Sequence, residues 1–440
     1  MSTQTSLLRS RRFAPLFVTQ FFGAFNDNLF KNALVVLLTF KAASWTSLKP
    51  ELLGNLAAGI FILPFFLFSA TAGQIVDKFD KARVARFVKL MEIAIMALAG
   101  SGFAAHSFAV LLAALFLMGM HSTLFGPVKY AILPQHLRPD ELVAGNALVE
   151  AGTFTAILLG TLAGGLLAAL DGGTVWITVA AVSIALAGYC ASRGIPPAPS
   201  AAAQLAIRFN PAIDTWRCIA DARANREVFI AIIGLSWFWL YGALFLAQFP
   251  AYAKNVLGGD ELSVTLLLAI FTIGIGTGSL ACDRLSGHKV ELGLVPFGAA
   301  GLTLFGLDFA LASPSGLPAH VSSLQQLLVD FSTWRILADL LLLGVFGGFF
   351  CVPLYALMQA RSAEDKRART IAANNILNAC FMVAGALGAS ALLATGWSIP
   401  HLFALAAVIN AVVAAGLFYS APEFGQRFVA WIRDFGQRPR

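Results

Sequence analysis

Charged side chains are scarce in this chain of 440 residues. Asp, Glu, Lys and Arg make up 12% of it and hydrophobic residues 58%, whereas a soluble protein carries about 25% charged residues. Long stretches contain no charge at all, and the mean hydropathy is +0.77. This composition excludes a soluble domain with a single anchor and indicates a polytopic integral membrane protein.

Cysteines and catalytic constellations are also rare or missing. The five cysteines are not spaced as metal ligands, so we expect reduced structural thiols. No nucleophile–base pair stands out, which argues against an enzyme and predicts neither catalytic residues nor a cofactor. No convincing signal-peptide cleavage site follows the first apolar run, which is therefore expected to remain as a helix. The net charge of +7 reports membrane orientation rather than nucleic-acid binding.

The apolar runs are those of membrane helices. Each is about 20 residues long, whereas the strands of a membrane barrel alternate over about 10 residues. The sequence therefore predicts an all-α integral membrane protein with twelve transmembrane helices. The predicted spans are 13–40, 54–75, 87–106, 108–127, 143–169, 174–193, 227–250, 262–282, 291–312, 335–358, 371–395 and 398–420.

Basic residues fix the predicted orientation. With Lys89 counted as a loop residue, 25 of the 30 Lys and Arg lie on the side of the termini and 4 on the opposite side. The remaining one, Lys31, lies inside the first span. Since such a bias marks the cytoplasmic side, both termini are predicted to be cytoplasmic.

A polar segment divides the chain into two halves. The predicted domains are an N-terminal six-helix bundle, a cytoplasmic linker, a C-terminal six-helix bundle and a cytoplasmic tail, at 1–193, 194–226, 227–420 and 421–440. Within the linker, Asn210 and Pro211 are suited to the N-cap and first position of a helix. We expect a basic amphipathic helix there, on the cytoplasmic membrane surface.

The two halves resemble each other. "GPVKYAILP" from Gly126 corresponds to "VPLYALMQA" from Val352, and Asn146 corresponds to Asn374 in the fifth helix of each half. Six helices separate the copies, so the repeats are parallel and related by an axis along the membrane normal. That is the two-domain plan of the major facilitator superfamily.

The loop "GQIVDKFDKAR" at 73–83 is similar to the signature of that superfamily between its second and third helices. An acid near a helix end and bases in the loop would make ion pairs and helix-dipole contacts that close the cytoplasmic gate. The second copy, at 279–289, has Ser279 in place of the glycine. Ordinary positive-inside anchoring is the alternative. The predicted gating residues are Gly73, Asp77, Lys78, Lys81, Arg83, Asp283 and Arg284.

The first span, "FFGAFNDNLFKNAL" at 21–34, is unusually polar. A charge at mid-helix costs roughly 2.5–3.5 kcal/mol and persists where it faces a bundle interior or cavity. Gln20, Asp27, Asn28 and Lys31 share one helix face. Asp27 and Lys31 either pair with each other or form a cavity site for a polar head group or an ion. The corresponding segment of the second half carries no charge, which favours a site in the first half.

Further polar residues join the predicted binding site. They are Lys129 at the end of the fourth helix, and Asn146 and Glu150 in the fifth.

Other polar residues in the spans can be explained by structural roles. Glu92 either belongs to this group or pairs with the basic loop, and the lone His121 is expected to be structural. Asp339 is expected to pair with Arg335 one turn earlier.

Several blocks are similar to the bacterial lysophospholipid transporter family, which also occurs fused to acyltransferase and acyl-ligase domains. They are "GAFNDNLFKNAL", "GPVKYAILP", "LVAGNALVEAGTFTAILLGTLAGG" and "GGFFCVPLYALMQ". The resemblance implies inward flipping of lysophospholipids across the bacterial inner membrane by a monomer, with sodium as the coupling ion. It makes Asp27, Asn28, Lys31, Lys129 and Glu150 the residues expected to carry transport.

The fused acyltransferase motif, His-x-x-x-x-Asp, does not occur, because His136 and Asp140 are one residue too close. Re-acylation is therefore expected from a separate enzyme. Two alternatives stay open: a major facilitator exporter of drugs or amphipathic metabolites, and a non-transporting scaffold for an acyltransferase.

Overall fold

The computed structural model describes residues 3–41, 50–314 and 322–437, and these are almost entirely helical. Twelve long helices follow the predicted spans. They are α2 (Ala14–Lys41), α3 (Pro50–Lys78), α4 (Lys81–Ala104), α5 (Phe108–Ala131), α7 (Leu142–Ala169), α8 (Gly173–Ser192), α10 (Arg226–Asn255), α11 (Glu261–Leu285), α12 (Leu294–Ala312), α14 (Phe331–Arg361), α15 (Arg367–Ala394) and α16 (Ile399–Ser420). The shorter helices are α1 (Thr3–Arg9), α6 (Leu133–His136), α9 (Pro211–Arg223), α13 (Leu324–Leu327) and α17 (Glu423–Gln437).

The all-α prediction is confirmed. Among the described residues, eleven helices are long and apolar enough to cross a membrane. The remaining long helix, α2, does not reach that hydropathy, because Asp27, Lys31 and three asparagines lie within it. The twelve-span prediction therefore depends on this polar helix.

The chain forms two compact units, and each unit includes a piece of both sequence halves. Unit 1 comprises Met1–Arg138, Thr155–Asn225 and Ser362–Ile376, and unit 2 comprises Pro139–Phe154, Arg226–Arg361 and Leu377–Arg440. Helices α7 and α15 are each divided between the units. The predicted halves, by contrast, are continuous in sequence.

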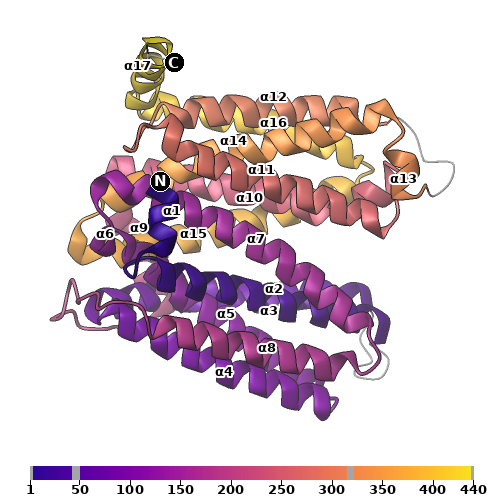
Figure 1. Ribbon diagram of the computed structural model, residues 1–440, viewed down its shortest axis with the longest axis horizontal. Helices are drawn as coiled ribbons and strands as arrows, with labels where there is room; N and C mark the ends of the chain where they lie inside the picture. The colour runs from indigo at the N-terminus through magenta and orange to yellow at the C-terminus, as the bar shows by residue number, and fades with distance from the viewer. Residues whose placement is uncertain (1–2, 42–49, 315–321, 438–440) are drawn as a thin grey trace. The chain divides into compact units, whose positions relative to one another are not determined.

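In unit 1, helices α2, α3, α4, α5 and α8 run side by side (Figure 1). Phe30, Leu115 and Met118 lie in their common hydrophobic core. The signature loop is short, because α3 continues to Lys78 and Asp80 caps α4 by accepting a hydrogen bond from the Arg83 N–H at 2.9 Å. This places the charges of the loop on helix ends.

In unit 2, α11 and α14 approach closely through small residues. A Cβ added at Gly348 would lie 2.4 Å from the Ser279 nitrogen, so a larger residue there would force the two helices apart. Phe245 stacks on Phe403 at a centroid distance of 4.2 Å and thereby joins α10 to α16. Both contacts are of the kind that hold membrane helices together without a hydrophobic driving force.

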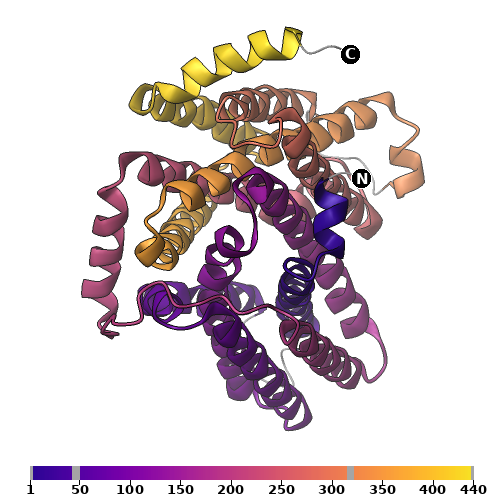
Figure 2. The same cartoon turned by 60° about the vertical axis from the view of Figure 1, so that its left-hand side comes forward.

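The linker before α9 lies against the ends of the unit 1 helices (Figure 2). The Ala198 carbonyl accepts from the Lys81 N–H, and the Asp77 carbonyl accepts from the Ala201 N–H. The predicted cap of α9 is confirmed, since Asn210 Oδ1 accepts from the Ile213 N–H at 3.1 Å.

The predicted tail contains a helix that the sequence analysis did not identify. Helix α17 packs against α12, with Phe424 and Trp431 buried. Arg427 forms an ion pair with Glu291, and the Trp431 indole donates to the Leu285 carbonyl at 3.0 Å. Because these contacts hold one face of the helix, the segment is a docked part of unit 2 rather than a free tail.

Candidate functional site

Two polar residues of α2, Asn26 and Asp27, face α4, α5 and α8 in unit 1. Asn26 is fully buried, and its Nδ2 donates to Glu92 Oε1 at 2.7 Å and to the Ala181 carbonyl at 3.2 Å. One asparagine thus joins three helices. The buried amide is satisfied by a carboxylate rather than exposed to lipid.

Glu92 is the centre of a buried charge cluster. It forms an ion pair with Lys89, three residues earlier on α4, and neither side chain has any exposed surface. His121 Nε2 of α5 lies 3.1 Å from the same carboxylate oxygen that Lys89 contacts, Oε2. Glu92 thus pairs with a base of the predicted loop segment, as one of the two alternatives expected. The structure places that base, Lys89, inside α4 rather than in a loop.

Asp27 lies on the opposite side of the imidazole. Its Oδ2 accepts from Ser122 Oγ at 2.5 Å, and its Oδ1 lies 3.9 Å from His121 Nδ1. His121 therefore lies between two carboxylates and is not an isolated structural histidine. With a neutral imidazole, Asp27, Glu92 and Lys89 together carry one net negative charge. One proton or one monovalent cation would balance it.

Lys31 does not pair with Asp27. No carboxylate of the described residues lies within 4.0 Å of its Nζ, which instead stands 5.2 Å from the centroid of the Phe61 ring. Such a cation–π contact is weaker than an ion pair in a desolvated setting. The ammonium group is thus available to a negatively charged ligand.

The amides near Asp27 do not surround it. Asn28 Nδ2 donates to the Ala24 carbonyl at 2.8 Å, and Asn32 Nδ2 donates to the Thr161 carbonyl at 2.7 Å. Sodium prefers several oxygen ligands, and of the side chains near this carboxylate only Ser122 supplies one that contacts it. Across the described ranges, no three His, Cys, Asp or Glu side chains are placed to hold a metal ion. The predicted sodium site gains no support from the amides.

The other predicted binding residues lie in different parts of the fold. Gln20 is buried on α2, and the Lys129 ammonium lies 4.6 Å from the Tyr130 ring centroid on α5. Asn146 and Glu150 are buried in the part of α7 that belongs to unit 2. Asn146 exchanges two hydrogen bonds with Gln359, at 2.8 and 2.9 Å. These hydrogen bonds engage the Asn146 amide in the contact between helices. A role of Asn146 in substrate binding stays a prediction.

Among the predicted gating residues, Asp77 is the most connected. It is buried and accepts from Arg369 Nε and the Ala368 N–H, both at 2.9 Å. Gly73 lies one turn earlier on α3, where an added Cβ would lie 2.8 Å from the Arg369 Cα. This turn of α3 therefore packs on the first turn of α15.

The remaining bases of the loop make no ion pair within 4.0 Å with Asp77 among the described residues. Lys81 donates to the Pro199 carbonyl at 3.3 Å, Lys78 lies beside the Phe79 ring, and Arg83 is exposed. In the second copy, Asp283 is buried and faces His288 Nδ1 at 3.0 Å within its own loop, and Arg284 is exposed. The two copies of the motif thus differ in what their acids bind.

One expected ion pair is wrong. Arg335 pairs with Asp308 of α12 and not with Asp339. Asp339 lies one turn from Arg335 on α14. The neighbouring helix α12 brings Asp308 to the guanidinium, and Asp308 is the ion-pair partner instead.

The family follows from comparison with known proteins. The family described as Major Facilitator Superfamily matches residues 16–375. The lysophospholipid transporter LplT of Escherichia fergusonii is 31% identical over 391 residues, which cover 85% of this chain and 86% of that protein. The chain belongs to the lysophospholipid transporter family of this superfamily. LplT of Salmonella arizonae is 30% identical over 426 residues, covering 92% and 96% of the two chains.

Solved structures agree with the fold of this major facilitator protein. The human organic anion transporter MFSD10 superposes with a TM-score of 0.69 at 16% identity, covering 92% of this chain and 99% of that one. FucP in its outward conformation superposes with a TM-score of 0.71 at 12% identity, covering 93% and 98%. The family match and the relatives, rather than these structures, make the chain a multi-pass membrane transporter and not an enzyme.

Proposed function

We propose that this transporter moves lysophospholipids inward across the bacterial inner membrane by alternating access, coupled to a cation, with both termini cytoplasmic. A separate acyltransferase or acyl-ligase would re-acylate the product. The observation that carries the proposal is the charge cluster of α2, α4 and α5, with Lys31 next to it, which pairs with no carboxylate of the described residues. The names of the relatives support the substrate class.

The chemistry of the cluster suits such a substrate. A lysophospholipid carries a phosphate, for which Lys31 supplies a cation without first breaking an ion pair. Phosphatidylethanolamine-type head groups also carry an ammonium, for which Asp27 supplies a carboxylate. One acyl chain then remains for apolar surroundings, and Phe61 beside Lys31 begins such a surface.

Purified protein in proteoliposomes with fluorescent lysophosphatidylethanolamine tests the proposal. We expect inward movement above that of empty vesicles, and a strong loss in Asp27→Asn and Lys31→Gln at unchanged expression. Asp171→Asn, an exposed acid between α7 and α8, is the matched control and should transport normally. If the wild type moves no lipid under any gradient, the proposed function is wrong. Movement of drugs in its place would support the exporter alternative.

The coupling cation has two candidates. Sodium is the ion expected from the resemblance, but the imidazole between two carboxylates favours a proton. Imposing a sodium gradient and a pH gradient separately distinguishes them. If the proton is coupled, uptake follows the pH gradient in the wild type, and His121→Asn removes that dependence while downhill movement persists. Uptake that follows only sodium and survives His121→Asn excludes the proton.

A further inference from the structure

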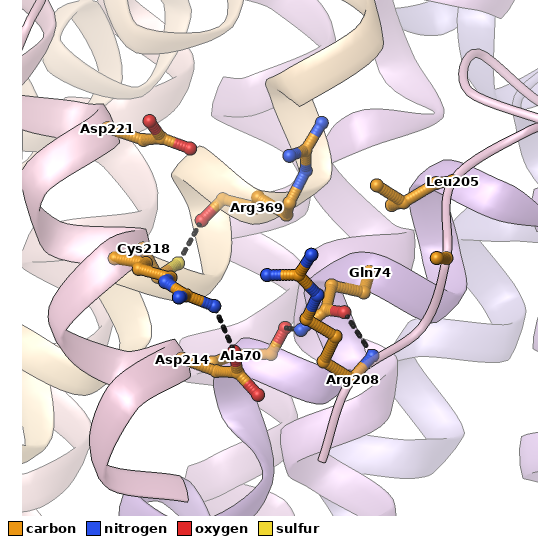
Figure 3. Close-up of a pocket in the computed structure, with 10 residues that line it drawn as sticks. Ala70, Gln74, Leu205, Arg208, Asp214, Cys218, Asp221 and Arg369 are labelled. Carbon is orange, nitrogen blue, oxygen red and sulfur yellow. Dashed lines mark hydrogen bonds and ion pairs between the residues drawn. The ribbon is translucent and has the colours of Figure 1, made fainter. Parts of the chain in front are cut away.

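Unit 1 contains a second polar site, separate from the charge cluster. A cavity of about 240 Å³ lies between the last turns of α3, the linker, α9 and the first turn of α15 (Figure 3). Its polar lining includes three arginines, two acids and an amide. They are Arg208, Arg217, Arg369, Asp214, Asp221 and Gln74. None of these belongs to the cluster around Glu92.

The acids of this arginine pocket are already engaged. Asp214 Oδ2 accepts from the Asn210 N–H at 2.8 Å, and its Oδ1 lies 3.8 Å from Arg217. Asp221 lies 3.7 Å from Lys366. Their negative charge is therefore balanced largely by groups other than Arg208.

Arg208 has a fixed backbone and a free side chain. Its N–H donates to Gln74 Oε1 at 2.8 Å, which anchors the linker to α3. Figure 3 shows its side chain pointing from the linker toward the middle of the pocket. Within the described part of the chain its guanidinium has no hydrogen-bond or ion-pair partner, so its five donors are available to an anion.

The thiol in the pocket adds no opposing charge. Cys218 Sγ donates to the Arg369 carbonyl at 2.9 Å. Burial raises the pKa of this thiol to about 12, so it is neutral near pH 7. The negative charges that line the pocket are therefore only those of Asp214 and Asp221, each of which already lies near a basic side chain.

Apolar side chains are exposed next to the pocket. Phe209 follows Arg208 directly and is 64% exposed, and Trp216 precedes Arg217 and is 70% exposed. Ile213, on the same side of α9 as Trp216, is 48% exposed. Basic groups beside an exposed apolar and aromatic surface match a lipid, which carries a phosphate next to acyl chains.

We propose that the arginine pocket binds the phosphate of an anionic phospholipid of the surrounding membrane. The proposal rests on the membrane orientation proposed above, which places α9 at the inner leaflet. Arg369 lines the pocket and also holds Asp77, so a bound phosphate would contact the same residue as the proposed gate. Binding should therefore stabilise the packing of α9 and α15 within unit 1.

The test is thermal unfolding of the purified protein in detergent with three probes. These are short-chain phosphatidylglycerol, short-chain phosphatidylcholine and inorganic phosphate, each titrated separately. We expect phosphatidylglycerol to raise the unfolding temperature at concentrations where the other two have no effect. Arg208→Gln should weaken the phosphatidylglycerol response about tenfold, the size of one lost charged hydrogen bond.

Two controls separate this result from other causes. Arg208 is exposed, so the unliganded variant should unfold at the wild-type temperature. Arg193→Gln removes an exposed arginine at the end of α8, outside the pocket, and should respond as the wild type does. An unchanged response in Arg208→Gln overturns the proposal, as does an equal response to inorganic phosphate or phosphatidylcholine. Because no transport is measured, this result is independent of the lysophospholipid assay.

Discussion

The side chains of Asp77 and Arg369 form an ion pair at 2.9 Å, although 292 positions separate them in sequence. Asp77 has no exposed surface, and Arg369 is 18% exposed. The same carboxylate accepts from the Ala368 N–H in the first turn of α15. Because of the helix dipole, a negative charge is unfavourable near the C-terminus of α3, where Asp77 lies in sequence, and favourable at the N-terminus of α15, which Asp77 contacts. The charge of Asp77 therefore stabilises the contact between helices rather than α3 itself.

Asp77→Asn should weaken this contact. The substitution removes a charge-assisted interaction worth about 1.5–3 kcal/mol, because a neutral amide cannot accept from Arg369 and Ala368 with equal strength. We expect a lower unfolding temperature and a reduced rate of lysophospholipid uptake. Thermal unfolding in detergent and the proteoliposome assay measure the two effects. The double variant Asp77→Arg with Arg369→Asp should recover part of the stability.

The second copy of the motif provides the matched control for Asp77. Asp283→Asn is the same chemical change at the equivalent helix end, but its carboxylate faces the half-exposed His288 of its own loop. It should therefore change stability and uptake much less. Equal effects of the two substitutions would show that loop charge in general, and not the contact with Arg369, is what matters.

Glu92→Gln tests the charge cluster. The substitution leaves Lys89 buried without its anion, which costs about 3–5 kcal/mol when one partner of a buried pair is removed. We expect poor thermal stability of the single variant. Adding Lys89→Met should restore much of it, since the pair is then replaced by uncharged groups. Transport should remain impaired in the double variant, because Asn26 and His121 still lose their carboxylate. Full transport would exclude a role for the cluster.

Trp431→Ala tests whether α17 is a structural part of unit 2. Its ring lies 5.5 Å from that of Phe297 on α12 and its side chain is 8% exposed. Removing a buried aromatic side chain costs about 3–5 kcal/mol. We expect a clear fall in unfolding temperature. Ile432→Ala, at an exposed neighbouring position, should change it little. Equal stability of Trp431→Ala and the wild type would mean that α17 is not docked in solution.

The sequence was sufficient to predict the long helices. A bilayer demands about 20 apolar residues per span, and this requirement leaves a signal in hydropathy that needs no tertiary information. Helix α17 was missed because its charged residues resemble a tail. Phe424, Phe428 and Trp431 recur at helical spacing there, and that periodicity was the available signal.

The contacts of the site could not be predicted in the same way. Sequence marked Asp27 as anomalous in its helix, but it could not show that Asn26 donates to Glu92, 66 positions away. Lys89 and Glu92 lie three apart in an apolar stretch, and this spacing is a local signal of a buried pair. Arg369 carried no local signal for Asp77, because only the packing of α3 on α15 brings the two together.

The reactivity of Cys218 should report on the contact between α9 and α15. Burial raises the pKa of this thiol to about 12, against about 8.5 for a free cysteine, so at pH 7.4 it holds over a thousandfold less thiolate. We expect very slow labelling by N-ethylmaleimide in the wild type. Because the pKa is raised, the rate should still climb about tenfold per pH unit from 7 to 9.

Asp77→Asn should accelerate this labelling. The thiol donates to the carbonyl of Arg369, so loosening the first turn of α15 exposes it to solvent and returns its pKa toward that of a free cysteine. The rate should then level off near pH 9. Mass spectrometry of the labelled peptides separates Cys218 from Cys190 and Cys380, and Cys218→Ser removes the signal. Rapid wild-type labelling at pH 7.4 would mean that α9 does not rest on α15.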